Sequence, residues 1–249
     1  MKERIKEYRV TLLTPCFCKV GKGKPEIRGA SVRGMIREWC RLLGGKPEAV
    51  WGGTGGNSSK VALEVKCDNL ATKTYPLLPH KEKGGGIEKA IEHNETFQLK
   101  LSRLVGCSDR AWNMAKTDLE NWLVIGCLGQ RANRAAGSVW CDDLGINDVA
   151  GLRDYVAKLK GSFCITSSFH SGLEARATAS DTTKNIKLFG SFNPRKPSPV
   201  KMKIVQLVEF DYRILLFAKE PGFLREAEYE LKNKPDNRRW KNVEFIYLR

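Results

Sequence analysis

Residues 126–138 have the sequence GCLGQRANRAAGS, which joins an apolar helix-like segment to a short strand-like segment. Its three glycines tolerate positive φ and carry no Cβ, so the backbone can turn tightly and approach a ligand closely. Arg131 and Arg134 add guanidinium groups, which suit phosphate. Taken alone, the stretch fits equally well a surface turn with two solvated arginines. The rest of the chain decides between these interpretations.

The residues up to and just after this loop follow the pattern of one small α+β unit. Apolar periodicity predicts strands at 8–13, 61–65, 97–101 and 138–141, and helices at 32–43 and 108–125. The order strand, helix, strand, strand, helix, strand is that of a ferredoxin-like unit, which RNA-recognition domains also use. The aromatic RNP motifs of RNA-recognition domains are absent from this sequence, so we do not expect bases to stack on the sheet. We therefore predict an α+β, ferredoxin-like (RRM-like) domain over residues 1–145, with the Gly-rich loop before its last strand.

Residues 146–249 follow a less regular pattern. Helices are expected from 151 to 160 and from 224 to 231, strands at 163–166 and within 204–217, and a polar loop at 167–184. Phe189-Gly190-Ser191 resembles Trp51-Gly52-Gly53, and an apolar strand-like run follows each. This faint repeat predicts a second, degenerate or partial ferredoxin-like unit, or an accessory α+β region. In the first half, residues 68–94 form a long polar segment, and such loops are usually functional or disordered.

The charge of the chain indicates a polyanionic partner. It has 43 Lys and Arg against 28 Asp and Glu, a net charge of +15, which favours nucleic acid first and an anionic membrane second. Arg33, Arg37 and Arg41 are i,i+4 neighbours on one predicted helix face, where like charges repel each other unless an anion binds. Glu38 and Glu48 are expected to neutralise them little. A solvated helix face remains the alternative interpretation.

Catalytic, metal and membrane motifs are not evident. The eight cysteines are mostly isolated, only Cys16 and Cys18 are close, and we expect them to be reduced. Neither a metal site nor a cofactor is expected, because no ligand cluster or phosphate-loop motif has suitable spacing. No apolar run approaches the ~18 residues of a membrane span. The sequence MKERIKEYRV has no signal-peptide pattern, so we expect a cytoplasmic protein without a membrane partner.

Four segments resemble the RAMP superfamily and, more narrowly, the first-numbered Cmr subunits of type III-B CRISPR–Cas effector complexes. Residues 27–39, IRGASVRGMIREW, resemble that family's R-x-x-S-[IV]-[RK]-G-x-[LI]-R-x-W helix. Residues 51–61, with WGG followed by SKV, are similar to F-G-S … S-[KR]-V, and residues 195–199, RKPSP, to R-x-P-S-P. Residues 126–138 are similar to G-G-[IL]-G-x-[RK]-x-R-R-G-x-G-S. Cys127 replaces the second glycine and Ala135-Ala136 replace an Arg-Gly pair, so we expect the loop to hold RNA less tightly.

The resemblance implies a non-catalytic subunit at the end of a multi-subunit complex for antiviral defence. It would bind the 3′ part of the guide RNA or the nearby target RNA, next to other RAMP subunits. The residues that would bind RNA by this resemblance are Arg28, Ser31, Arg33, Arg37, Lys60, Arg131, Asn133, Arg134 and Arg195. Ser31 would also cap its helix, whereas Trp51 is expected to lie in the core.

Two other functions stay open at this stage. A RAMP endoribonuclease that processes CRISPR precursor RNA could use His80, which lies beside Lys81 and near Lys83. A basic protein associated with the nucleoid or the ribosome, with no CRISPR link, would also account for the charge.

Overall fold

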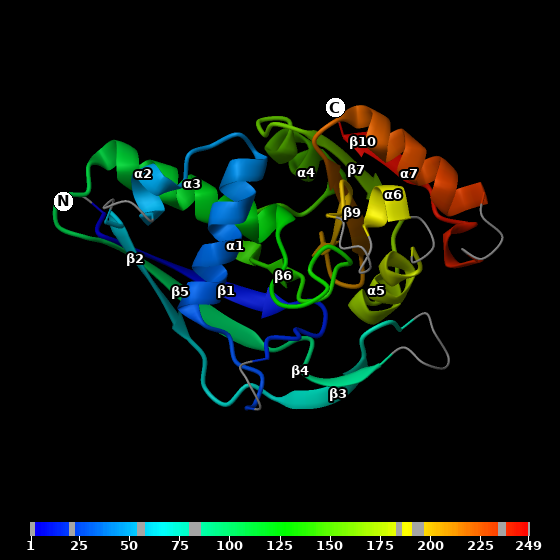
Figure 1. Ribbon diagram of the computed structural model, residues 1–249, viewed down its shortest axis with the longest axis horizontal. Coiled ribbons are helices and arrows are strands. Elements are labelled where there is room, and N and C mark those ends of the chain that lie inside the picture. The colour runs from blue at the N-terminus through cyan, green and yellow to red at the C-terminus, as the bar shows by residue number, and fades with distance from the viewer. Residues whose placement is uncertain are drawn as a thin grey trace.

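The computed structural model describes residues 3–19, 23–53, 58–79, 86–182, 186–190, 197–233 and 238–248. Figure 1 shows two α+β units next to each other, with the N-terminus in the first and the C-terminus in the second. Within the described residues, no helix combines the length and apolar character that crossing a membrane requires.

The first unit has the strand order of a ferredoxin-like fold. Its strands are β1 (Ile5–Leu12), β2 (Val61–Lys66), β5 (Thr96–Arg103) and β6 (Val139–Trp140), and its helices are α1 (Gly29–Leu42), α2 (Glu48–Trp51) and α3 (Asp109–Ile125). The sheet has the antiparallel order β2-β5-β1-β6. Tyr8, Val10 and Leu12 alternate with exposed or half-buried residues along β1, so one face of the sheet packs under the helices.

The predicted polar loop at 68–94 contains a hairpin. Its strands are β3 (Thr72–Pro76) and β4 (Ile87–Ile91), which pair from Thr72↔Ile91 to Pro76↔Ile87. In Figure 1 this hairpin extends below the first sheet toward the second unit. Half of the residues in its strands are exposed, but Tyr75, Ala90 and Ile91 are buried, and Tyr75 and Ala90 pack with Phe17 and Ala136. The hairpin therefore contacts the Gly-rich loop, a relation that its polar composition does not indicate.

The second unit repeats the strand order of the first. Its elements are α4 (Val149–Val156), β7 (Ser162–Thr166), α5 (Gly172–Ser180), α6 (Ile186–Phe189), β8 (Lys201–Gln206), β9 (Tyr212–Ala218), α7 (Pro221–Asn233) and β10 (Phe245–Leu248). The one-turn helices η1 (Asp142–Leu144) and η2 (Arg238–Trp240) lie outside both sheets. The second sheet has the antiparallel order β10-β7-β9-β8. All four strands of a ferredoxin-like unit are thus present, where the sequence predicts a degenerate or partial one.

Helix α5 occupies part of the region expected to be a polar loop at 167–184. The Ser171 side chain caps it by accepting a hydrogen bond from the Glu174 N–H at 3.2 Å. Apart from Arg176, its buried positions carry small residues, such as Ala175 and Ala179, instead of large apolar ones. Because these residues give almost no hydrophobic periodicity, the sequence pattern does not predict the helix.

The two units share one core. Trp39 of α1 packs edge-on against Phe217 of β9, with ring centroids 5.1 Å apart. Backbone bonds also join the Gly-rich loop to β8, because the Ala135 N–H donates to the Met202 carbonyl at 3.1 Å. The Ile204 N–H donates to Ser138 Oγ at 2.9 Å. The outer edge of the second sheet is therefore occupied by the loop of the first unit.

Candidate nucleic-acid interface

The glycines of the 126–138 loop serve the packing of its own backbone. Gly129 and Gly137 have φ of +86° and +63°, and Gly126 follows the end of α3. A Cβ at Gly137 would lie 1.9 Å from the Leu128 carbonyl oxygen, and one at Gly126 would lie 2.2 Å from the Trp122 ring. These contacts explain the glycines without any ligand, so the glycine spacing does not by itself indicate an anion site.

Arg131 lies at the outward tip of the loop. It has a left-handed backbone with φ of +59°, and its carbonyl accepts from the Arg134 N–H at 2.8 Å, which closes a tight turn. Its side chain is exposed. Figure 1 shows the loop between α1, β6 and α5, on the side of the molecule facing the viewer. Arg131 can therefore meet a phosphate without rearrangement of the loop.

Arg134 points the other way. Its guanidinium donates to the Phe189 carbonyl and lies 5.0 Å from the Phe189 ring centroid. Burial lowers the pKa of Arg134 to about 9, so the side chain stays charged at neutral pH. This geometry corrects the sequence prediction, because Arg134 holds the loop onto α6 and its hydrogen-bonded nitrogen is not available to phosphate.

Asn133 connects the loop to the second unit through Lys201, which is not among the residues predicted to bind RNA. Lys201 Nζ donates to Asn133 Oδ1 at 2.9 Å and lies 3.3 Å from the Glu38 carboxylate of α1. It also lies 5.9 Å from the Trp39 ring centroid. Lys201 follows the resembling segment 195–199 by two residues, which is the signal that could have identified it.

Helix α1 begins earlier than predicted, and this changes the role of Ser31. Residue Arg28 has the extended φ and ψ of a capping position, and its side chain makes no cap hydrogen bond. Ser31 therefore lies within the first turn and is exposed, so the prediction that it caps the helix is wrong. Arg28 is exposed and forms a 3.0 Å ion pair with Glu26. Surface pairs of this kind are weak and can exchange for a phosphate.

Glu48 partly neutralises the arginines of α1, contrary to expectation. Arg41 donates to Glu48 Oε1, and Arg37 Nη2 lies 3.7 Å from the same oxygen. The hydrogen bond from Arg41 and the charges of both arginines hold the pKa of Glu48 below its usual range. Arg33 is exposed and has no ion pair with any residue that the structure describes. Of the three, Arg33 is the cation most available to an external anion.

Lys60 lies far from the loop. Its carbonyl accepts from the Leu104 N–H at 3.0 Å, which places it near the start of α3, whereas the loop follows the end of that helix. A helix of 17 residues is about 25 Å long at 1.5 Å per residue. Lys60, which the resemblance implies would bind RNA, therefore does not lie beside Arg131.

The predictions for Arg195, His80 and Trp51 have different outcomes. Arg195 and His80 lie outside the described residues. Trp51 is 1% exposed, and its Nε1 donates to Asp118 Oδ2 at 2.9 Å, so its predicted core position is confirmed. Among the residues that the structure describes, no His, Cys, Asp and Glu side chains cluster in a way that could hold a metal ion.

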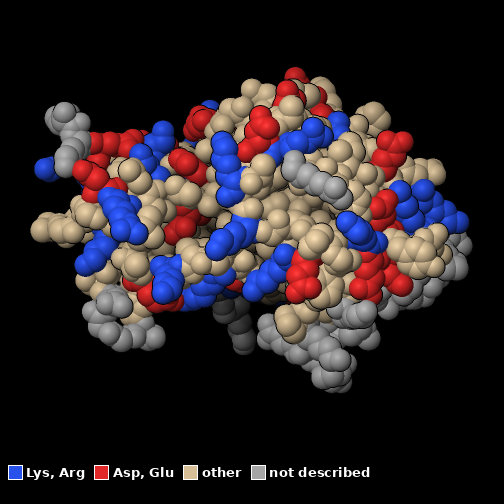
Figure 2. Space-filling view, turned by 90° about the horizontal axis from the view of Figure 1, so that it is seen from above, with Lys and Arg blue, Asp and Glu red and all other residues tan. Residues whose placement is uncertain are grey.

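On the face shown in Figure 2, basic side chains are spread out and do not form one dense patch. Figure 2 shows Lys and Arg across the middle of the face seen from above, with Asp and Glu among them. The cations most relevant to a ligand are those around the loop. We name the surface formed by Arg131, Asn133 and Lys201 the junction face, since Lys201 of β8 joins Asn133 of the Gly-rich loop to Glu38 of α1. Arg33 and Arg37 lie on the same helix α1.

Comparison with known proteins identifies a family and a fold. The family model described as "RAMP superfamily" matches residues 9–140. A search of curated proteins found no match. The crystal structure of apo Cmr1 from Pyrococcus furiosus has a TM-score of 0.63 and 20% identity, over 87% of this chain and 88% of that chain.

Two cryo-EM structures of the type III-B Cmr-beta complex also contain a similar chain. In the complex bound to cognate target RNA and AMPPnP in the presence of ssDNA, the TM-score is 0.60 with 9% identity, over 87% of this chain and 94% of that chain. In the complex bound to cognate target RNA, the values are 0.57 and 11%, over 90% and 98%. At these identities the likeness is one of fold.

Proposed function

The chain belongs to the RAMP superfamily, and on that premise we propose that it is a non-catalytic RNA-binding subunit of a type III, Cmr-type CRISPR–Cas effector complex. Its partners in this proposal are guide RNA, target RNA and other RAMP subunits. The fold supports this, because the chain matches Cmr1 and chains of Cmr complexes over 87–90% of its length. The complex would act in the cytoplasm in antiviral defence.

The position of Arg131 carries the proposal. A rigid turn projects this arginine from the loop, and the loop is fixed to both units by backbone hydrogen bonds. Lys201 lies on the adjoining strand β8, and Arg33 is exposed on α1. Cations held on three different elements can contact successive phosphates of one strand without reading its sequence. We therefore place the sugar-phosphate backbone of the RNA across the junction face.

Single substitutions at Arg131 and Arg33 test this placement. We expect Arg131→Ala to weaken binding of single-stranded RNA roughly three- to tenfold at moderate salt, and to lower the slope of log affinity against log salt by about 0.7–1, as for one lost phosphate contact. Arg33→Ala should behave in the same way. Affinity is measured by fluorescence anisotropy at several salt concentrations.

The matched control is Arg110→Ala, because Arg110 is an exposed arginine on α3, away from the junction face. If Arg131→Ala and Arg33→Ala give the affinity and salt slope of this control, the junction face does not bind RNA. Arg134 is unsuitable for the test, since its replacement would loosen the loop itself.

Two further experiments address the role in the cell. Incubation of the purified chain with repeat-containing RNA in the absence of metal should give binding without cleavage, whereas cleavage that His80→Ala abolishes would favour the endoribonuclease. Affinity purification from the native host should recover other RAMP subunits and a discrete guide RNA. Recovery of ribosomes or bulk nucleoid DNA without guide RNA would favour the nucleoid- or ribosome-associated protein.

A further inference from the structure

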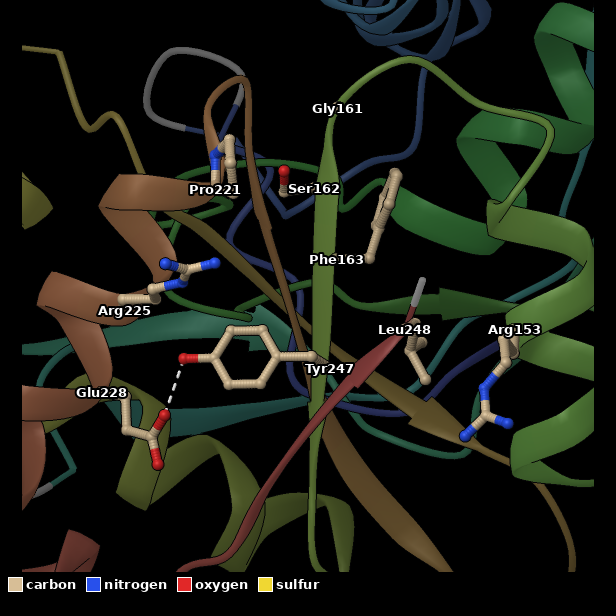
Figure 3. Close-up of a pocket in the computed structure, with 9 residues that line it drawn as sticks. All are labelled: Arg153, Gly161, Ser162, Phe163, Pro221, Arg225, Glu228, Tyr247 and Leu248. Carbon is tan, nitrogen blue, oxygen red and sulfur yellow. Dashed lines mark hydrogen bonds between the residues drawn. The ribbon is translucent and has the colours of Figure 1, made fainter.

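A cavity of about 690 Å³ opens in the second unit, between α4, β7, α7 and β10. It shares no lining residue with the junction face and so is a separate feature of the molecule. Its volume lies within the range of about 300–1,000 Å³ that small-ligand sites occupy. Figure 3 shows its lining, with Tyr247 in the centre and charged side chains on both sides.

Two arginines reach this cavity from different helices. Arg225 comes from α7 and Arg153 from α4, and Figure 3 shows them on opposite sides of β10. Both are exposed, and neither forms an ion pair with a residue in the described ranges. Ser162 of β7 adds a hydroxyl group to the lining. Uncompensated guanidinium groups with a nearby hydroxyl donor suit phosphate oxygens.

The one carboxylate in the lining already has partners. Glu228 accepts a hydrogen bond from the Tyr247 hydroxyl at 2.6 Å and from Lys232 Nζ at 2.9 Å. The phenol and the ammonium group therefore offset its charge, and it does not neutralise the two arginines. The net character of the cavity is that of a site for an anion.

The same hydrogen bond orients an aromatic ring beside the cations. Because its hydroxyl is bound to Glu228, the ring of Tyr247 is held in a fixed position between α7 and α4 (Figure 3). A flat nucleobase can stack on such a ring at about 1–3 kcal/mol per base. An anion without a flat apolar part, such as inorganic phosphate or an acidic peptide, would use the arginines and leave the ring uncovered.

We propose that this cavity binds a nucleoside phosphate, with its phosphate on Arg225 and its base against Tyr247, whereas Arg153, on the other side of β10, is placed to hold a second phosphate of an RNA strand. The nucleotide could be free in solution or could be one unit of an RNA strand. If the nucleotide belongs to an RNA strand, the inference rests on the proposed function, and the cavity would extend the RNA path from the junction face to the second unit. If the nucleotide is free in solution, the inference is independent of the proposed function.

Titration of the full chain with adenosine monophosphate and uridine monophosphate, followed by isothermal calorimetry, tests the free form. We expect at least one nucleotide to bind more tightly than inorganic phosphate, and Arg225→Ala to weaken that binding about tenfold, as for one lost charged contact. Arg153→Ala should change the affinity for free nucleotides little and weaken only the binding of an RNA strand. Arg225→Lys should retain part of the affinity. Tyr247→Phe should retain the preference over phosphate, which Tyr247→Leu should lose, and Arg110→Ala should change nothing.

Photo-crosslinking of 4-thiouridine-labelled single-stranded RNA to the full chain, with the crosslinked peptide identified by mass spectrometry, tests the RNA form. Crosslinks at or beside Tyr247 that Arg225→Ala removes would support the inference even without binding of free nucleotides. The inference is overturned if nucleotides bind no better than phosphate and RNA crosslinks only elsewhere, or if Arg225→Ala matches Arg110→Ala in both experiments. Failure of RNA binding at the junction face would instead appear as an unchanged salt slope in Arg131→Ala.

Discussion

Arg131 and Arg134 show how the same side chain takes different roles three residues apart. Both lie in one loop, yet Arg131 is exposed at its tip, whereas Arg134 is bound to the Phe189 carbonyl inside the protein. Ala135 lies in the same turn with φ of +60° and is fully buried. The loop thus holds an alanine in a left-handed conformation that glycine adopts more easily.

At the residue scale we first predict the effect of a Cβ at Gly137. Gly137→Ala would combine a left-handed conformation with a clash against the Leu128 carbonyl oxygen, and should lower the free energy of unfolding by about 2–4 kcal/mol. Gly145→Ala is the matched control, because Gly145 has φ of +67° with open space around it. It should cost about 1–2 kcal/mol. Urea denaturation measures both, and equal losses would contradict the packing argument.

Lys203 gives a second prediction at this scale. It is 1% exposed, its Nζ donates to the Leu123 carbonyl, and burial lowers its pKa to about 7 from an ordinary value of 10.5. Between these two values the unfolded chain holds a proton that the folded chain has released, so folding becomes more favourable as the pH rises from 7 toward 10. The penalty for burying the charge is fully present below pH 7.

The slope of stability against pH measures this contribution. Lys203→Met should flatten the rise in the free energy of unfolding between pH 7 and pH 9, which could reach about 1 kcal/mol per pH unit in the wild type. Lys219→Met is the control, because Lys219 is exposed. A slope unchanged in Lys203→Met would show that this lysine remains protonated in the folded protein. Loss of the bond to Leu123 affects the absolute stability but not the slope.

At the scale of elements, the β3–β4 hairpin joins parts of the molecule that are distant in sequence. Arg176 of α5 is 2% exposed and donates to the carbonyls of Pro76 and Leu77 at 3.1 and 3.4 Å. Its guanidinium also lies 5.0 Å from the Phe17 ring centroid. One side chain of the second unit therefore holds the hairpin of the first unit beside the Gly-rich loop.

Arg176→Gln should release the end of this hairpin. We expect a loss of about 2–3 kcal/mol of stability, since two charge-assisted hydrogen bonds are lost, and faster hydrogen exchange of the amides in residues 72–79 and 86–91. Hydrogen exchange with mass spectrometry detects this locally. Arg110→Gln serves as the exposed control. Exchange that rises equally over the whole chain would indicate global destabilisation and no special role in the hairpin.

At the scale of the whole molecule, the two units are inseparable in their packing. The Gly-rich loop occupies the edge of the second sheet through β8, and Trp39 and Phe217 connect the two cores. The junction face exists only in this arrangement, because Lys201 and Asn133 come from different units. RNA binding and the association of the two units should therefore be lost together.

Thermal unfolding tests this coupling. The wild type should unfold in one cooperative transition, and Trp39→Ala should lower the free energy of unfolding by about 3–5 kcal/mol, because it leaves a cavity against Phe217. Calorimetry, together with circular dichroism, follows both effects. Met114→Ala, at a position of α3 where the side chain is 37% exposed, provides the control. Two separate transitions in the wild type would show that the units fold independently.

The sequence by itself determined the first ferredoxin-like unit, the basic helix α1 and the Gly-rich loop, because hydrophobic periodicity, turn residues and charge are local properties. Only the tertiary structure decided which arginine of the loop faces solvent, that Lys60 lies at the far end of α3, and that Glu48 pairs with Arg37. It also revealed α5 and the Arg153–Arg225 cavity. Each of these depends on contacts between residues far apart in the chain, and local sequence patterns carry no record of such contacts.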